Sequence, residues 1–195
     1  MTVRAASGAW HWTWPLGKMT RVVATVVLAA GAASRFGAPK QSLLLPEVLR
    51  RVRESSVDDI VVVSGAHPIE TDARTVDCPE WQRGPGVSLR CGLTALGPDV
   101  DAAVVVLADG PNLASAAIDR VIAAWRDGAG AVVAASYDGD RGHPVLLARP
   151  VWPEIPDEGA RLLEPVLVPC DDLGSPGDVD FADEVPGRLR EEPEG

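Results

Sequence analysis

The sequence has very little lysine and no excess of positive charge. Its 195 residues hold two lysines and sixteen arginines, and the formal net charge is −10 with a pI near 4.7. Nucleic acids and acidic membrane surfaces would repel such a chain, so we expect neither as a partner. No apolar run approaches the length of a membrane span. A nucleotide bound in a locally basic pocket, together with a divalent cation, remains compatible with this composition.

Cysteine is also scarce. Cys78, Cys91 and Cys170 lie far apart in the sequence, without a CxxC motif or a Cys/His pair. This pattern excludes a zinc site with regular ligand spacing and does not indicate a disulfide framework. We therefore expect three free thiols in a reducing compartment, the cytoplasm.

A secretory signal is absent as well. Residues 1–20 contain three tryptophans among small and polar residues, but no apolar stretch with a small-residue cleavage site. They show neither a helical nor a strand period. We predict a poorly ordered leader at 1–20, a single domain at 21–186 and a charged tail at 187–195.

What the sequence does contain is an alternation of strand-like and helix-like segments. This order predicts a three-layer α/β/α sandwich with a mostly parallel sheet. Strands are expected at 22–28, 60–63, 100–108, 131–135, 145–147 and 166–168, with helices at 46–54, 84–96, 116–126 and 175–185 and a short one from Asp157. Pro46 is predicted in the first turn of its helix, and Ser115 and Ser175 are predicted as N-caps.

The first predicted strand opens into a loop of small residues. Ala29, Ala30 and Gly31 follow it directly, and Arg35 and Lys40 come next. Small side chains let backbone N–H groups approach an anion, and the two cations would offset its charge. The loop is thus either a phosphate-binding turn or an ordinary strand–turn–helix with a basic edge. Lys40 is the only lysine beyond the leader, which favours a phosphate-seeking point charge there.

Later segments carry further candidates. Gly84-Pro85-Gly86 precedes Ser88 and Arg90, which is consistent with an anion-facing turn or with a plain loop. Asp109 directly follows a predicted strand, where open α/β sheets bind ligands and where a carboxylate can hold Mg²⁺. It could otherwise cap the next helix. His143, between Gly and Pro, is more typical of a structural turn than of a catalyst.

Taken together, the segments LAAGAASRFGAPK (28–40), GPGVSLRCGL (84–93), LADGPNL (107–113), GHPVLL (142–147), DEGAR (157–161) and DLGSPGDV (172–179) resemble the MobA-like nucleotidyltransferases. The resemblance runs from Val22 to about Val185 and implies a glycosyltransferase-A-type nucleotidyltransferase fold. The Leu-Ala-Ala-Gly sequence is similar to that of the molybdenum cofactor cytidylyltransferases. It implies transfer of CMP from CTP to a phosphorylated acceptor such as molybdopterin, with release of pyrophosphate and a molybdoenzyme as a candidate partner.

The resemblance also implies roles for individual residues. Arg35 and Lys40 would neutralise triphosphate charge, and His143 would border the acceptor. Asp109 and Asp172 would bind Mg²⁺, with Asp109 acting in catalysis. The residues expected to bind the nucleotide are Leu28, Ala29, Ala30, Gly31, Ser88 and Arg90.

Two departures from the family pattern keep alternatives open. Leu45 runs almost directly into Pro46, where the family has a longer segment, and Gly174 stands where its closing motif has an Asp. One alternative is a nucleotidyltransferase for a sugar phosphate or a phosphoenolpyruvate-like acid. Another is a non-catalytic nucleotide-binding homologue.

Overall fold

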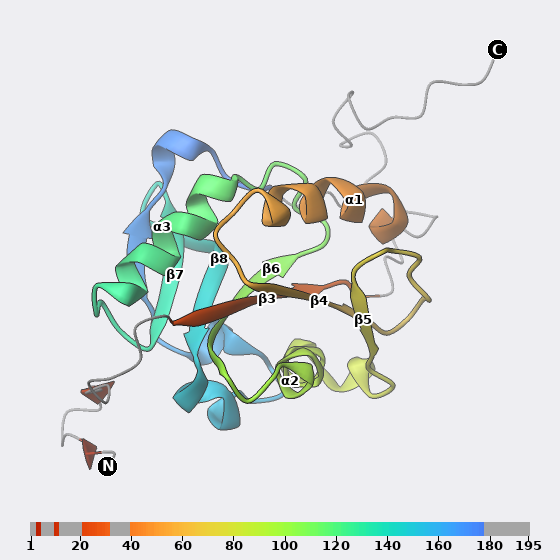
Figure 1. Ribbon diagram of the computed structural model, residues 1–195, viewed down its shortest axis with the longest axis horizontal. Helices are drawn as coiled ribbons and strands as arrows, with labels where there is room; N and C mark the ends of the chain where they lie inside the picture. The colour runs from red at the N-terminus through yellow and green to blue at the C-terminus, as the bar shows by residue number, and fades with distance from the viewer. Residues whose placement is uncertain (1–2, 5–9, 12–20, 32–39, 178–195) are drawn as a thin grey trace.

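The computed structural model describes residues 3–4, 10–11, 21–31 and 40–177 (Figure 1). Two short strands of the predicted leader, β1 (Val3–Arg4) and β2 (Trp10–His11), pair antiparallel in a separate small sheet. The rest of the leader, the loop at 32–39 and residues 178–195 lie outside the described part. The predicted tail therefore stays a prediction.

The main sheet has seven strands in the order β5-β4-β3-β6-β8-β7-β9. Six of the seven strands were predicted from apolar runs, and one of them, β8, extends well beyond its predicted segment. β8 runs antiparallel to both of its neighbours, whereas the other pairings are parallel. The strands are β3 (Val22–Leu28), β4 (Asp59–Ser64), β5 (Arg74–Asp77), β6 (Val100–Leu107), β7 (Val132–Tyr137), β8 (Asp140–Ala148) and β9 (Val166–Pro169).

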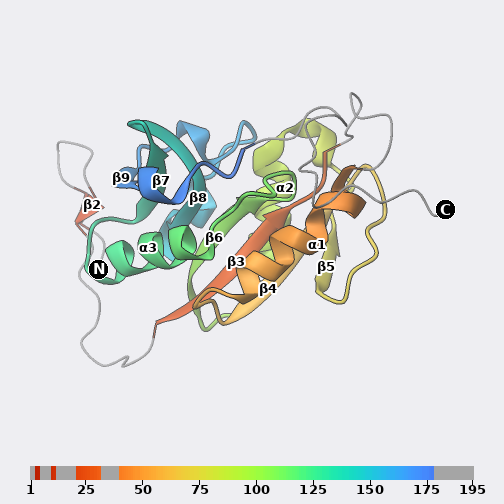
Figure 2. The same ribbon diagram turned by 90° about the horizontal axis from the view of Figure 1, so that it is seen from above.

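Helices cover both faces of this sheet. α1 (Lys40–Arg53) and α3 (Ser115–Arg126) lie side by side on one face, and α2 (Pro85–Ala95) lies on the other (Figures 1 and 2). The alternation of side chains along a strand explains the two cores. Val23 and Val27 pack toward α1 and α3, whereas Ala24 and Val26 pack toward α2. The predicted three-layer, mostly parallel architecture is confirmed. Short 3₁₀ helices complete the fold: η1 (Trp81–Arg83), η2 (Arg149–Glu154), η3 (Ala160–Leu162) and η4 (Asp171–Leu173).

The prediction that Pro46 lies in the first turn of its helix is wrong. α1 begins at Lys40, and Pro46 lies inside it and is exposed. A proline within a helix removes one backbone hydrogen bond and crowds the preceding turn. The helix continues through this position because Leu44, Leu45 and Val48, on either side of Pro46, are completely or almost completely buried against the sheet.

One strand was missed, and three further local predictions need correction. β5 was not predicted, because its four residues are mostly exposed and main-chain pairing with β4 holds them. Ser115 is the first residue of α3 and not its cap, and the short helix at 157–161 is instead η3, which begins at Ala160. Ser175 to Gly177 are not helical, and the remainder of that predicted helix lies outside the described residues.

The prediction of three free thiols is wrong for two of them. Cys78 and Cys91 form a disulfide, with their Cα atoms 6.0 Å apart. Cys78 directly follows the edge strand β5, and Cys91 lies on α2, which packs against β5. Tertiary packing therefore brings the two cysteines together. Cys170 is free and buried, as expected.

Candidate active site

The candidate site lies where the strand order reverses. From β3 the chain passes through α1 to β4 on one side, and it later returns through α2 to β6 on the other side. Open α/β sheets bind ligands beyond the carboxyl ends of the strands at such a switch point. Leu28 ends β3 and pairs in register with Leu107, which ends β6. The main chain is held there, because the Ala29 N–H donates to Val63 O at 3.0 Å and the Ala108 N–H donates to Leu28 O at 3.0 Å.

Two adjoining hollows open at this edge. One, of about 310 Å³, lies between β3, β6, β8, the first turns of α2 and residues 158–161, and we call it the α2 hollow. The other, of about 650 Å³, extends past Gly110 to Ser175–Gly177, and we call it the C-terminal hollow. Both have the size of a small-ligand site. Five residues line both hollows: Leu107, Arg141, Gly142, His143 and Arg161.

The predicted nucleotide-binding residues of the first strand and its turn lie at the α2 hollow or behind it. Leu28 lines the hollow. Ala29 and Ala30 are buried next to it, and Gly31 is exposed. Ser88 is only 5 % exposed within α2, whereas its neighbour Leu89 lines the hollow. The structure thus brings β3 and α2 to one hollow, with Ser88 one layer behind the surface.

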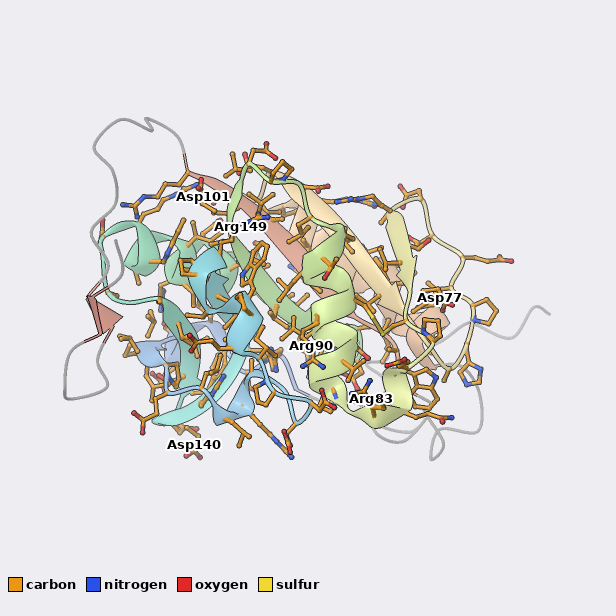
Figure 3. The ribbon with its side chains drawn as sticks, turned by 90° about the horizontal axis from the view of Figure 1, so that it is seen from below. Asp77, Arg83, Arg90, Asp101, Asp140 and Arg149 are labelled. Atoms are coloured by element: carbon orange, nitrogen blue, oxygen red, sulfur yellow. A yellow bond between two sulfur atoms is a disulfide. The ribbon has the colours of Figure 1, made fainter. Side chains whose placement is uncertain are left out.

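Arg90 is engaged by protein groups and does not line either hollow. Its Nη1 donates to Ile155 O at 2.6 Å, and its Nη2 pairs with Asp157. Asp157 also accepts from Arg83 Nη2 at 3.1 Å. Figure 3 shows Arg90 on α2 and Arg83 beyond the N-terminal end of that helix, in η1. The hydrogen bond from Arg90, followed by the charge of Arg83, holds the pKa of Asp157 below its usual value. Arg90 therefore fastens residues 155–157 to α2, and its predicted contact with the nucleotide stays a prediction.

The two glycines at the start of α2, Gly84 and Gly86, have a packing role that the sequence did not reveal. A Cβ on Gly86 would lie 1.8 Å from Pro156 O, and one on Gly84 would lie 2.2 Å from Asp157 O. The Gly86 N–H donates to Asp157 O at 2.9 Å. Glycine is required here because the 156–157 backbone approaches closely. In this structure the predicted anion-facing turn faces another segment of the protein.

The two predicted metal ligands lie in different surroundings. Asp109 is half-buried in the turn after β6, next to Gly110, which lines the C-terminal hollow. Asp172 lies in η4, its side chain is 65 % exposed, and both its oxygens accept from Arg120 of α3, at 2.7 and 2.9 Å. The hydrogen bond from Arg120 lowers the pKa of Asp172. Asp172 lines neither hollow.

The donor set nevertheless fits a magnesium ion bound together with phosphates. Within residues 21–31 and 40–177, no three His, Cys, Asp or Glu side chains gather as a metal site. Mg²⁺ commonly takes only one or two protein carboxylates and completes its shell with water and substrate phosphates. Asp109 is the candidate for such a carboxylate; it lines neither hollow itself but directly precedes Gly110, which lines the C-terminal hollow.

His143 lines both hollows and is oriented by the sheet. Its Nδ1 lies 3.2 Å from Val105 O, and because a carbonyl can only accept, Nδ1 carries the proton. The Tyr137 hydroxyl donates to His143 O at 3.0 Å, and burial raises the pKa of Tyr137 to about 12. His143 lies in β8 and not in a turn, next to Pro144.

The predicted cations of the loop are only partly described. Arg35 lies outside the described residues. Lys40 is the first residue of α1, beside this edge of the sheet, and its side chain lies outside them too. Two arginines that were assigned no role, Arg141 and Arg161, line both hollows. The signal for Arg161 was its place in the DEGAR segment, and Arg141 immediately precedes the GHP segment.

None of the helices formed by the described residues is both long and apolar enough to cross a membrane.

Several solved structures are similar to this chain. No curated protein matches the chain significantly. A homologue of Mycobacterium tuberculosis Rv0371c from Mycobacterium sp. strain JC1 is 27 % identical with a TM-score of 0.70, and the match covers 86 % of this chain and 94 % of that one. Rv0371c from M. tuberculosis H37Rv is 26 % identical with a TM-score of 0.68, covering 84 % and 95 %. A structure of Rv0371c in complex with manganese is 24 % identical with a TM-score of 0.60, covering 76 % and 88 %.

The family model described as the MobA-like NTP transferase domain matches residues 25–163. This range begins within β3 and includes α2, Asp109, His143 and the 155–161 segment, so it takes in most of the residues that line the α2 hollow. The chain therefore belongs to the MobA-like NTP transferase domain family and is a nucleotidyltransferase.

Proposed function

We propose that the protein transfers CMP from CTP to a phosphorylated acceptor such as molybdopterin and releases pyrophosphate. The observation that carries this proposal is the α2 hollow at the switch point, lined by Leu28 where β3 enters the Ala29-Ala30-Gly31 turn. The preference for CTP rests on the Leu-Ala-Ala-Gly sequence of that turn, which is similar to that of the cytidylyl branch. A molybdoenzyme is the proposed partner. The cytoplasm stays the proposed compartment on the family resemblance alone, because the Cys78–Cys91 disulfide removes the argument from three free thiols.

The chemistry requires alignment and charge neutralisation. An oxygen of the acceptor phosphate forms a bond to the α-phosphorus of CTP. The bond from that phosphorus to the oxygen bridging toward the β-phosphate breaks, and pyrophosphate leaves with this oxygen. Little covalent help from the protein is needed. Arg35 and Lys40 are proposed to neutralise the triphosphate, and His143 to border the acceptor.

Mg²⁺ is the proposed cofactor, held by Asp109. A bound divalent cation supplies charge stabilisation to the phosphates. The manganese complex of Rv0371c supports a divalent ion at such a site. Asp172 remains the proposed second carboxylate, and it would have to leave Arg120 to take part.

A non-catalytic nucleotide-binding role is the second candidate, and the region around Gly174 favours it. Gly174 has φ +73° and ψ 149°, a conformation that side chains rarely adopt, so the Asp of the family motif would be strained there. With Asp172 paired to Arg120, residues 172–174 offer no uncommitted carboxylate. In this case nucleotide would bind without turnover.

One experiment separates the two functions. The purified protein is incubated with Mg²⁺ and with CTP, GTP or ATP, and both the melting temperature and pyrophosphate release with molybdopterin, a sugar phosphate or phosphoenolpyruvate are measured. We expect CTP to stabilise the protein most and molybdopterin to support release. A GTP preference would contradict the cytidylyl assignment, and stabilisation without any pyrophosphate release would favour the non-catalytic role.

A further inference from the structure

Arg161 differs from the other arginines of the described chain. Twelve arginine side chains are described within residues 21–31 and 40–177, and eleven of them donate a hydrogen bond or form an ion pair. The guanidinium of Arg161 does neither within this part of the protein. Its main-chain carbonyl only accepts a hydrogen bond, from Arg141 at 3.3 Å. A charged group with five N–H donors is thus left without an acceptor among the described residues.

Arg161 belongs to the lining that the two hollows share, as do Arg141 and His143. The α2 hollow also has Glu158 in its lining, whereas the eleven lining residues of the C-terminal hollow include no carboxylate. Among the described residues, the C-terminal hollow is lined by two arginines and a histidine and by no acidic side chain, and in a chain of net charge −10 this lining favours an anion.

The backbone that carries Arg161 is held in place. Arg141 donates to Leu163 O at 2.8 Å and to Ala160 O at 3.0 Å, which adds to its bond to Arg161 O. The three hydrogen bonds that the Arg141 side chain donates therefore all go to the 160–163 segment, and burial lowers the pKa of Arg141. Because Arg141 is committed to the backbone, Arg161 is the lining arginine that can offer its planar fork to a ligand. A guanidinium fork suits the oxygens of a phosphate.

We propose that Arg161 binds the phosphate of the acceptor in the C-terminal hollow. The inference rests on the proposed function, because it assigns the acceptor's phosphate monoester to one of the two hollows and leaves the α2 hollow to the nucleoside. Glu158 lines only the α2 hollow, where its negative charge would repel a phosphate. This supports placing the phosphate in the C-terminal hollow. The phosphate would then lie at the junction, next to the nucleotide.

Inorganic phosphate serves as the probe. It is titrated calorimetrically into the protein saturated with CTP and Mg²⁺, and into the protein without nucleotide. The variants are Arg161→Gln, which removes the charge, Arg161→Lys, which keeps it, and Arg126→Gln as a control on an exposed arginine at the end of α3. The change in melting temperature with CTP is recorded for each variant.

We expect Arg161→Gln to weaken phosphate binding at least about tenfold, Arg161→Lys to fall between this variant and the wild type, and Arg126→Gln to match the wild type. The thermal shift with CTP should be the same in all four proteins. Equal phosphate affinity in wild type and Arg161→Gln, or no phosphate binding to the wild type, would overturn the inference even if CTP binds. Loss of phosphate binding in Arg161→Gln with no CTP binding to any protein would instead contradict the proposed function and leave the anion site standing.

Discussion

Two parts of the candidate site use their arginines in opposite ways. We call them the α2 wall, which is α2 with the preceding η1 and residues 155–157, and the opposite wall, which is β8 with residues 160–163. On the α2 wall, Arg83 and Arg90 are both paired with Asp157, and a disulfide ties α2 to the chain after β5. On the opposite wall, Arg141 holds the backbone and Arg161 is left unpaired within the described residues. An arginine in a motif is therefore no sign of ligand contact by itself. What distinguishes the two walls is whether a protein acceptor already uses the guanidinium.

The largest effect is expected from removing the carboxylate of Asp109, which belongs to neither wall. Asp109→Asn should lower kcat by at least about 100-fold, roughly 3 kcal/mol in the barrier, because the variant would hold less tightly the proposed metal ion, whose positive charge offsets that of the phosphates. The melting temperature should change little. Pyrophosphate release with CTP measures the effect, and Asp140→Asn at the exposed start of β8 is the matched control. Full activity of Asp109→Asn would remove Asp109 from the site.

The second largest effect is expected from removing the disulfide between Cys78 and Cys91, which ties the α2 wall to the chain after β5. Cys91→Ser should lower the free energy of unfolding by about 3 kcal/mol in oxidising buffer, because the disulfide closes a short loop of the unfolded chain. Denaturant unfolding followed by circular dichroism measures it. In reducing buffer the wild type should approach the variant. Equal stability of the two proteins in oxidising buffer would show that the cysteines are not bonded in solution.

Adding a methyl group at Gly86 in the α2 wall should lower stability somewhat less. Gly86→Ala places a methyl group against Pro156 O and should cost about 2–3 kcal/mol of stability while raising the KM for CTP. Gly174→Ala is the comparison, since nothing lies within 4 Å of its Cβ and only its φ of +73° is strained. We expect it to cost about 1 kcal/mol. If the order of the two variants were reversed, the close approach of residues 156–157 to α2 would be wrong.

The smallest effect concerns the exposed ion pairs of Asp157. Because the pKa of Asp157 is lowered in the folded protein, its ionised form stabilises the fold above the usual value of 3.8, and this contribution is lost as the pH falls through the folded pKa. Asp157→Asn should therefore be slightly less stable than the wild type at pH 7. The difference should vanish in strongly acidic buffer, as measured by melting temperature against pH. A difference that persists unchanged at low pH would point to packing instead of charge.

Most of the fold was predictable because local patterns report burial. The runs around Val26, Val62 and Val105 are apolar on both faces, and each became a central strand covered by helices on both sides. β5 escaped prediction because an exposed edge strand carries no such pattern. Pro46 was misplaced because a local rule for proline was outweighed by the burial of the leucines beside it.

The candidate site was predictable only in part. Leu28 and His143 could be singled out from their motifs, and the structure places both in the lining of the α2 hollow. Arg90 was singled out for the same reason, yet its acceptors lie on residues 155 and 157. Nothing local in the sequence indicates which distant carbonyl or carboxylate will reach a guanidinium.

By itself, the sequence determined the alternation of strands and helices, the family and the ends of strands at which ligands bind. These follow from periodicity and from short motifs, which depend on neighbouring residues. Only the tertiary structure decided that Cys78 meets Cys91, that Arg90 is tied to the 155–157 segment and that Arg161 keeps its guanidinium without a partner among the described residues. These outcomes depend on which segments the packing of α2 and β8 brings side by side, and contacts between residues tens of positions apart leave no periodic trace in the chain.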